Sequence, residues 1–330
     1  MDRKKKIIVT GGAGFVAHHF VEHIIKNTDW DVIIIDKLGL SSMGYDRLRD
    51  IDVYDDKRVH IVNHDFRSPA TEGVIRECRG TDYFIHMAAE THVDRSIENP
   101  VPFIDANVYG THNALFMAKD LAVKRFMYFS TDEVFGPAKW PKEYQEWERY
   151  KSGNPYAATK AGGEELALAY ANTYKSPVII THTMNVFGER QYPEKFIPMC
   201  IRKIRDGEKI IIHSSRDKTK IASRYWIHAR NVADVTLFIL NNGHVGDKYN
   251  IVGETEMNAL EMAQHIAAIM DKPFEYELSD YHSSRPGHDM RYALNGEKVL
   301  RMGYVYPKTF MQSLEKTVQW MLDNPKWLEI

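Results

Sequence analysis

The chain has 330 residues, of which 44% are hydrophobic and 27% are charged, enough for a large core in one or two domains. Its formal net charge of −2 gives no electrostatic basis for binding nucleic acid or an anionic membrane surface. The two cysteines, Cys78 and Cys200, form no CxxC pair, and no apolar run has the length of a signal-peptide core or a membrane span. We therefore expect a cytoplasmic protein.

Six short apolar segments, rich in β-branched and aromatic residues, alternate with segments of helical period in the first half of the chain. The apolar segments are 6–10, 31–36, 58–62, 82–88, 124–130 and 177–183, and the helical ones include 15–26, 101–120 and 158–174. This alternation predicts an α/β fold with a doubly wound parallel sheet of the Rossmann type, covered on both faces. Beyond about residue 190 the loops lengthen, and helical patterns return at 230–241, 257–270 and 309–323.

The segment TGGAGFVA follows the first predicted strand and opens the first predicted helix, with the spacing Gly11-x-x-Gly14-x-x-Ala17. Such glycines let the backbone approach a pyrophosphate at a helix N-terminus, where Phe15 and Val16 lie. We therefore predict an NAD-binding domain over residues 1–188. A smaller, mainly substrate-binding lobe is expected over 189–330, with some segments that can return to the first domain.

Acidic residues end the next two strands. Asp36 lies about twenty residues after the glycines, where a carboxylate can bind the adenosine ribose and favour NAD over NADP. Lys37 follows it and could still accommodate a 2′-phosphate. Asp65, with Phe66 beside it, is expected at the adenine edge, although an ordinary turn aspartate is the alternative.

Tyr156 and Lys160 are four residues apart, just after Pro155, which is a favourable helix start. A lysine beside a phenol favours the phenolate, so Tyr156 is a candidate base for the oxidation of an alcohol by NAD. Thr131 could hydrogen-bond the same alcohol oxygen. The alternatives are a surface helix pair and a strand-end threonine that caps a turn.

Asp132 and Glu133 directly follow the buried strand 124–130 in STDEVFG. Adjacent like charges disfavour double ionisation, so one carboxyl group can keep its proton near neutral pH. The pair then offers an acid and a base side by side. Two acids in a solvated turn are the alternative.

These residues together resemble the extended short-chain dehydrogenase/reductase superfamily, and most closely its nucleotide-sugar 4,6-dehydratases. The resemblance runs nearly end to end, through TGGAGFVA, MAAETHVDRSIENP, STDEVFG, NPYAATKAG, QYPEKFIP, RYWIHARNVAD, KYNIVG, SSRPGHDMRYALN and TVQWMLDNPKW. It implies NAD-dependent oxidation at C4 of a nucleotide-diphosphate hexose, loss of water across C5 and C6, and return of the hydride to C6. NAD should then stay bound through turnover, with Glu133 as the C5 base, Asp132 as the acid and Tyr156 as the C4 base.

The resemblance also assigns binding residues. Met87, Ala88, Ala89 and Thr91 would line the cofactor and the sugar, and Asn107 would support the cofactor and the Tyr156–Lys160 pair. The substrate diphosphate and nucleoside would lie among Asn185, Lys195, Phe196, Arg224, Asn250, Arg285 and His288. Arginine suits phosphate because its planar fork makes two hydrogen bonds at once. The resemblance further implies a homodimer contact through the helical segments at 100–120 and 155–174. The alternative is that the apolar faces of both segments pack on their own sheet.

Some features depart from the family pattern. The stretch SSRDKTKIAS before Arg224 is several residues longer than the family's turn, and Val186-Phe187 replaces the usual pair after Asn185. The choice between dTDP-glucose and UDP-glucose therefore stays open. Other open readings are a 4-epimerase, a decarboxylase and a catalytically silent NAD-binding scaffold. His19 and His23 are four residues apart but lack a third ligand, so we expect no metal site.

Overall fold

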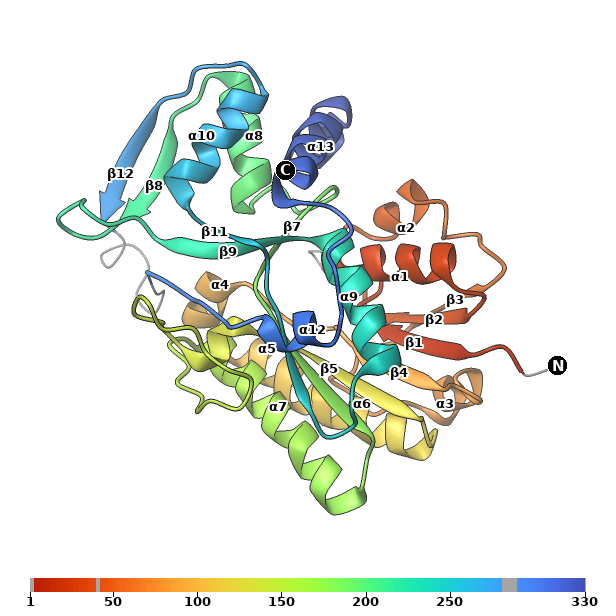
Figure 1. The fold of residues 1–330 in the computed structure, drawn as a ribbon. Coiled ribbons are helices and arrows are strands. Elements are labelled where there is room, and N and C mark those ends of the chain that lie inside the picture. Colours follow the sequence, from red (N-terminus) through yellow and green to blue (C-terminus); the bar gives the residue numbers. More distant parts are fainter. Residues whose placement is uncertain (1–2, 40–41, 281–289, 330) are drawn as a thin grey trace.

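The structure is a computed structural model of the chain, and it describes residues 3–39, 42–280 and 290–329. Its centre is a sheet of seven parallel strands in the order β10-β6-β5-β4-β1-β2-β3 (Figure 1). The strands are β1 (Lys6–Thr10), β2 (Asp31–Asp36), β3 (Val59–Asn63), β4 (Tyr83–His86), β5 (Arg125–Thr131), β6 (Val178–Thr183) and β10 (Lys248–Ile251). The prediction of a doubly wound parallel sheet is confirmed.

The strands carry apolar side chains on both faces, and helices cover both faces of the sheet. Ile7 and Val9 pack in one core cluster with α1 (Phe15–Asn27), α2 (Asp46–Asp50), α9 (Ala229–Asn242) and α12 (Glu297–Arg301). Ile8 points the other way, into a cluster with α3 (Glu72–Glu77), α6 (Gly110–Asp120) and α7 (Pro155–Tyr174). This period-two alternation of fully buried side chains gives a parallel sheet two dry faces.

The segment predicted as one helical run at 101–120 consists of three parts. After α4 (Val93–Glu98), α5 (Val101–Ile104) leads into a π-helical turn, η2 (Asp105–Tyr109), and then into α6. The wide turn contains Asn107, whose side chain is hydrogen bonded to both backbone polar atoms of Glu90. π-helical turns of this kind are frequent at functional sites.

A second layer of structure packs beside the carboxyl ends of the strands (Figure 1). It has a three-stranded sheet, with β9 (Ser223–His228) between β7 (Asn185–Phe187) and β11 (Thr255–Asn258), and a parallel pair, β8 (Ile210–Ser214) with β12 (Tyr276–Asp280). Its core is formed with α8 (Phe196–Asp206), α10 (Ala259–Ile269) and α13 (Phe310–Asp323), which precedes η4 (Pro325–Trp327). The division at residues 188 and 189 stays a prediction, and β10 and α9, from beyond it, lie with the central sheet.

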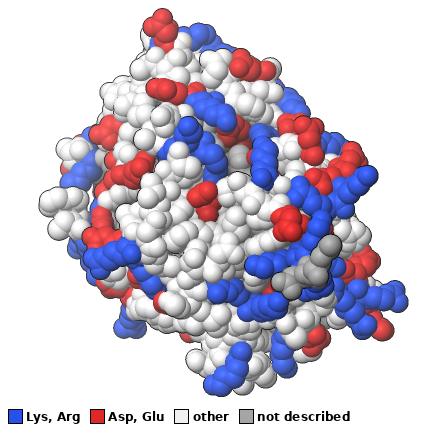
Figure 2. Space-filling view, turned by 45° about the vertical axis from the view of Figure 1, so that its right-hand side comes forward, with Lys and Arg blue, Asp and Glu red and all other residues white. Residues whose placement is uncertain are grey.

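No helix within the described ranges is both long and apolar enough to cross a membrane. On the face that Figure 2 shows, basic and acidic side chains are interspersed, in agreement with the small net charge.

Candidate active site

A cleft of about 680 Å³ lies at the carboxyl ends of β1, β4, β5 and β6, between the central sheet and the second layer. Ligands of open α/β sheets bind at this edge, where the strand order reverses between β1 and β4. Most of the predicted residues line this cleft: Gly11, Gly14, Phe15, Val16, Asp36, Lys37, Asp65, Phe66, Met87, Ala88, Ala89, Thr91, Thr131, Asp132, Glu133, Tyr156, Lys160, Asn185, Lys195, Phe196 and Arg224.

Two predicted residues do not reach the cleft, and two others fall outside the described residues. Asn250 is 1% exposed, and its side-chain amide is hydrogen bonded to His182 and to the backbone of Tyr144 and Asn295. Asn107 holds the Glu90 backbone from behind the cleft wall. Arg285 and His288 lie in 281–289, outside the described ranges.

The glycine turn after β1 forms the floor of one end of the cleft. Gly11 has a φ of +68°, and a Cβ there would lie 2.9 Å from the Ala88 Cα, so only glycine fits. Helix α1 starts directly afterwards with Gly14 as its N-cap, and no side chain caps its first N–H groups. A close backbone and an uncapped helix N-terminus fit the pyrophosphate of NAD.

The strand-end acids lie beside this turn. Asp36 accepts hydrogen bonds from the backbone N–H groups of Ala13, at 3.0 Å, and Leu38, at 2.8 Å, and burial raises its pKa. Lys37 Nζ lies 2.7 Å from a carboxylate oxygen of Glu90. That carboxylate offsets the charge that Lys37 would offer to a 2′-phosphate, so this end favours an unphosphorylated ribose.

Asp132 and Glu133 lie at the centre of the cleft, in the short helical turn η3 (Asp132–Phe135) that follows β5. Burial raises the pKa of Asp132 to about 6. Burial, together with the negative charge of Asp132, raises the pKa of Glu133 to about 7. The pKa values of both carboxyl groups therefore lie near neutral pH. The sequence analysis expected one retained proton from the adjacent charges, whereas burial is the larger cause.

The hydrogen bonds of the two carboxyl groups differ. Thr131 Oγ1 donates to Asp132 Oδ1 at 2.9 Å, while Asp132 Oδ2 is buried with no hydrogen-bond partner in the described part of the chain. Asn154 Nδ2 donates to Glu133 Oε2 at 2.9 Å. An amide N–H binds a carboxylate oxygen well, so Asn154 favours the ionised form of Glu133 but leaves its pKa the higher of the two.

Helix α7 brings Tyr156 and Lys160 to the same cleft. Its start is fixed by Pro155 at the first position, by Asn154, whose side chain accepts from Ala157 N at 2.8 Å, and by Ser96, whose Oγ accepts from Tyr156 N at 3.1 Å. Asn154 thus caps the helix and contacts Glu133. The sequence analysis missed it, although an asparagine before a proline is a recognisable helix start.

The expected effect of Lys160 on Tyr156 is not present in this arrangement. Burial and the nearby charge of Glu133 raise the pKa of Tyr156, and a hydrogen bond with Thr131 opposes the rise. Lys160 Nζ donates to the backbone oxygen of Phe129 at 2.8 Å, and burial lowers its pKa to about 7. The prediction of a lowered phenol pKa was wrong because it weighed only the lysine charge and not the loss of water.

Cationic side chains from the second layer border the carboxyl pair. Arg224 lies with its guanidinium 4.5 Å from the centre of the Tyr292 ring, and its charge opposes the rise in the pKa of both Asp132 and Glu133. The charge of Lys195 also opposes the rise at Glu133. Tyr292 and His213 line this end as well. Tyr292 lies in the segment SSRPGHDMRYALN, but the sequence analysis gave neither residue a role.

The histidines of the first helix have separate contacts. His19 is buried, with Nε2 at 3.1 Å from the Glu189 backbone oxygen, and His23 lies 3.5 Å from Asp234. Within the described ranges, no group of three or more histidine, cysteine, aspartate or glutamate side chains is arranged to hold a metal ion.

Comparisons with known proteins agree with this geometry. Residues 7–252 match the model of the NAD dependent epimerase/dehydratase family. The chain is 34% identical to dTDP-glucose 4,6-dehydratase 1 of Escherichia coli, across 98% of this chain and 94% of that protein. It is 33% identical to the human dTDP-D-glucose 4,6-dehydratase, across 97% of this chain and 91% of that protein.

Among solved structures, the chain resembles the dTDP-glucose 4,6-dehydratase DesIV of Streptomyces venezuelae, with NAD and TYD bound. The TM-score is 0.89 and the identity 33%, and the match covers 98% of this chain and 99% of that one. The chain therefore belongs to the NAD-dependent epimerase/dehydratase family.

Proposed function

We propose that the protein dehydrates dTDP-glucose to the 4-keto-6-deoxy sugar, with NAD as a resident cofactor. One observation carries this proposal: two buried carboxyl groups that titrate near neutral pH, Asp132 and Glu133, line one cleft with the Tyr156–Lys160 pair. Elimination of water needs such a proton acceptor and donor, whereas alcohol oxidation alone does not. The named relatives, at 33–34% identity over nearly the whole chain, support the dTDP-sugar.

Residues of α7 and of the end of β5 carry out the dehydrogenation half of the reaction. Tyr156 accepts the proton of the C4 hydroxyl in its deprotonated form, against the raised pKa, and Thr131, which is hydrogen bonded to Tyr156, orients that hydroxyl. NAD held in the cleft would supply the hydride acceptor for C4 and the hydride donor for C6, so there would be no net oxidation. Gly11, Gly14 and Asp36 would hold its pyrophosphate and adenosine ribose.

The elimination half falls to the carboxyl pair. Oxidation at C4 acidifies the C5 proton, which Glu133 removes, while Asp132 protonates the leaving C6 hydroxyl to form water. As hydride reaches C6, the protonated Glu133 gives a proton, exchangeable with solvent, back to C5. Asn154 donates to Glu133, which suits a carboxylate, and the Oδ2 of Asp132 is the oxygen without a partner, which suits a proton carrier. Once Asp132 is protonated, the negative charge that helps to raise the pKa of Glu133 is gone. The hydrogen bonds, rather than the order of the two pKa values, therefore guide this assignment.

The nucleotide and its diphosphate would bind at the far end of the cleft, among Asn185, Lys195, Phe196 and Arg224. The cationic pair suits the diphosphate charge.

Mass spectrometry of reactions in deuterated water, without added NAD, tests this function. The purified protein is incubated separately with dTDP-, UDP-, CDP- and GDP-glucose and with UDP-glucuronic acid. Loss of one water with one deuteron gained at C5, from dTDP-glucose, is the expected result. The same product from UDP-glucose alone would move the proposal to that nucleotide. An unchanged mass with an inverted C4, or loss of carbon dioxide from a uronic acid, would show an epimerase or a decarboxylase instead.

We also propose that the protein is a homodimer. Apolar side chains are exposed along the segment from α5 to α7: Val101 is 58% exposed, Ile104 48%, Tyr109 49%, Phe116 50% and Tyr174 51%. A second copy of this face would bury them in a bundle of four helices. Light scattering should give twice the chain mass, and F116E should lower it to one chain. A monomeric wild-type protein would refute the proposal.

We also propose a cytoplasmic location. The support for it is that Cys78 and Cys200 are both buried free thiols.

A further inference from the structure

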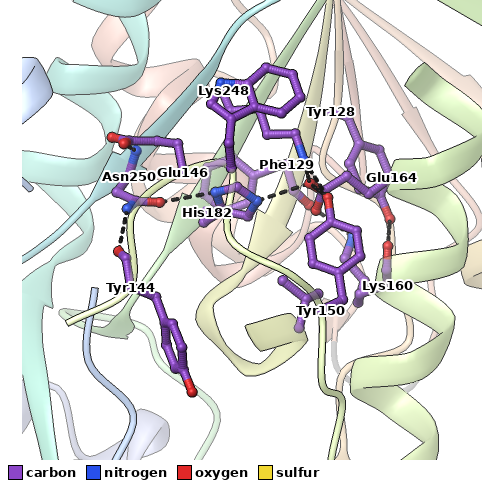
Figure 3. A network of polar contacts seen from close by, with 12 residues as sticks. Tyr128, Phe129, Tyr144, Glu146, Tyr150, Lys160, Glu164, His182, Lys248 and Asn250 are labelled. Carbon is purple, nitrogen blue, oxygen red and sulfur yellow. Dashed lines mark hydrogen bonds and ion pairs between the residues drawn. The ribbon is translucent and has the colours of Figure 1, made fainter. Parts of the chain in front are cut away.

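Behind the catalytic face of α7 lies a buried polar cluster, which we call the Glu164 cluster: Tyr150, Glu164, His182 and Lys248. Figure 3 shows three of these side chains converging on the carboxylate of the fourth. Glu164 Oε1 accepts from His182 Nε2 at 3.0 Å, from Lys248 Nζ at 2.8 Å and from the Tyr150 hydroxyl. Glu164 and His182 are 0% exposed at their side chains, and Lys248 is 4% exposed.

The cluster ties four segments together. Glu164 lies on α7, His182 on β6, Lys248 on β10 and Tyr150 on the loop that leads to α7. Asn250 extends it, because its Oδ1 lies 3.0 Å from His182 Nδ1. None of these residues lines the cleft, so the proposed chemistry does not use them.

Glu164 is one turn beyond Lys160 on α7, so the two side chains share a helix face. Lys160 is 3% exposed, and its ammonium donates to an uncharged acceptor, the Phe129 oxygen. A buried cation without an opposite charge tends to lose its proton. Burial does lower the pKa of Lys160, and the charge of Glu164 is what opposes that shift.

The cluster in turn keeps Glu164 ionised. Burial alone would raise the pKa of Glu164, but His182 and Lys248 together lower it to about 2. The negative charge behind Lys160 is therefore permanent over the working range of pH.

We propose that Glu164 is a positioning residue for the dehydrogenation step: its carboxylate, clamped by His182, Lys248 and Tyr150, is the counter-charge that keeps the Lys160 ammonium protonated beside Tyr156. This inference rests on the proposed function for its consequence in catalysis, but the charge state of Lys160 can be measured without turnover.

Other groups also face Lys160. They are Tyr156 on α7, Tyr128 on β5, whose ring centre lies 4.4 Å from Lys160 Nζ, His86 on β4, and Asp132 and Glu133 after β5. Burial, with the charge of Lys160, lowers the pKa of His86 to about 3, so it stays neutral. Burial raises the pKa of both phenols, so neither supplies a permanent negative charge beside Lys160. Glu164, one turn further along α7, is thus the ionised group whose charge acts on Lys160.

The test is a pH titration of Lys160 itself, followed by the ¹³Cε resonance in lysine-labelled protein and assigned with K160M. The variants are E164Q, E164D and the double variant E164Q/K248M, which removes the unpaired lysine that E164Q would leave. E165Q is the matched control, because it makes the same change at the neighbouring exposed position on α7.

The titration midpoint of Lys160 should fall by about one pH unit in E164Q and by less in the double variant, which also loses the Lys248 charge, while E164D and E165Q stay near wild type. The alkaline limb of the kcat profile on dTDP-glucose should move down by the same amount, with the acid limb in place. An unchanged Lys160 midpoint in folded E164Q would overturn the inference and leave Glu164 a purely structural role. Wild-type protein inactive on dTDP-glucose would refute the proposed function instead, and the lysine titration would still decide this inference.

Discussion

The cleft and the Glu164 cluster both hold carboxyl groups out of water, yet their pKa values shift in opposite directions. Burial raises the pKa of Asp132 to about 6 and, with the charge of Asp132, that of Glu133 to about 7. Glu164 is buried as well, but His182 and Lys248 lower its pKa to about 2. Burial alone therefore does not set the charge of a carboxyl group; the number of cations and N–H donors around it does.

The difference separates chemistry from support. A carboxyl group poised near neutral pH can give or take a proton during turnover. One whose pKa is about 2 cannot, but it supplies a fixed charge to its neighbours. The same helix, α7, carries Glu164 on its buried side and Tyr156 in the cleft.

The largest effect is expected from E133Q, which removes the proposed C5 base. Dehydration should slow by roughly 10²–10⁴-fold, the usual share of a general base. Oxidation at C4 should persist, so NADH absorbance should build up on the enzyme when dTDP-glucose is added. E165Q, at an exposed position, should turn over normally. A variant that neither oxidises nor dehydrates would place Glu133 in substrate binding or orientation instead.

The next largest effect is on stability, for E164Q. Neutralising one member of a buried ion pair leaves Lys248 without its charge partner and should cost roughly 3–5 kcal/mol of unfolding free energy near neutral pH. Because the pKa of Glu164 falls from 4.5 to about 2 on folding, its stabilisation is complete above 4.5 and is lost as the pH falls toward 2. Denaturant unfolding should show the gap to wild type closing over that range. The double variant E164Q/K248M should recover part of the lost unfolding free energy. A difference between wild type and E164Q that stays the same at every pH would contradict this account.

E133Q should instead stabilise the protein. The pKa of Glu133 rises from 4.5 to about 7 on folding, so ionised Glu133 is a penalty that is complete above 7 and vanishes as the pH falls to 4.5. Replacing it should raise the unfolding free energy by about 3 kcal/mol at mildly alkaline pH and by almost nothing in acid. The same denaturant series measures this. Destabilisation at alkaline pH would mean that the site favours the carboxylate after all.

The smallest effect is expected from N154S, which keeps the helix cap but removes the amide that donates to Glu133. Asn154 opposes the rise in the pKa of Glu133, so its loss should raise that pKa further and move the acid limb of activity to higher pH. A lost hydrogen bond of about 1 kcal/mol corresponds to roughly fivefold in rate near neutral pH. The deficit should disappear in alkaline buffer. An equal deficit at every pH would point to a disturbed helix start.

Much of the first domain could be predicted from sequence because its signals are local. The strands β1 and β2 match their predicted ranges residue for residue, since apolar β-branched runs between polar turns define them. Tyr156 and Lys160 were found from helical spacing, and Asp132 and Glu133 from their place after a strand. The direction of the Tyr156 pKa was not found, because the sequence does not show how deeply a phenol is buried.

The Glu164 cluster could not be predicted, because its members meet only through tertiary structure. His182 and Lys248 come together because β10 pairs with β6, with Asn250 opposite His182, across more than sixty residues of sequence. No local pattern reports such a pairing. Asn250 was assigned to the substrate by resemblance, and the same pairing places it in this buried network instead.

One titration tests the contrast between the two regions most directly. In protein labelled with ¹³C at glutamate carboxyl groups, the Glu133 and Glu164 resonances are assigned by their absence in E133Q and E164Q and followed with pH. Glu133 should titrate near 7, and Glu164 should stay ionised well below 4.5. Two midpoints close to 4.5, the ordinary glutamate value, would contradict the account.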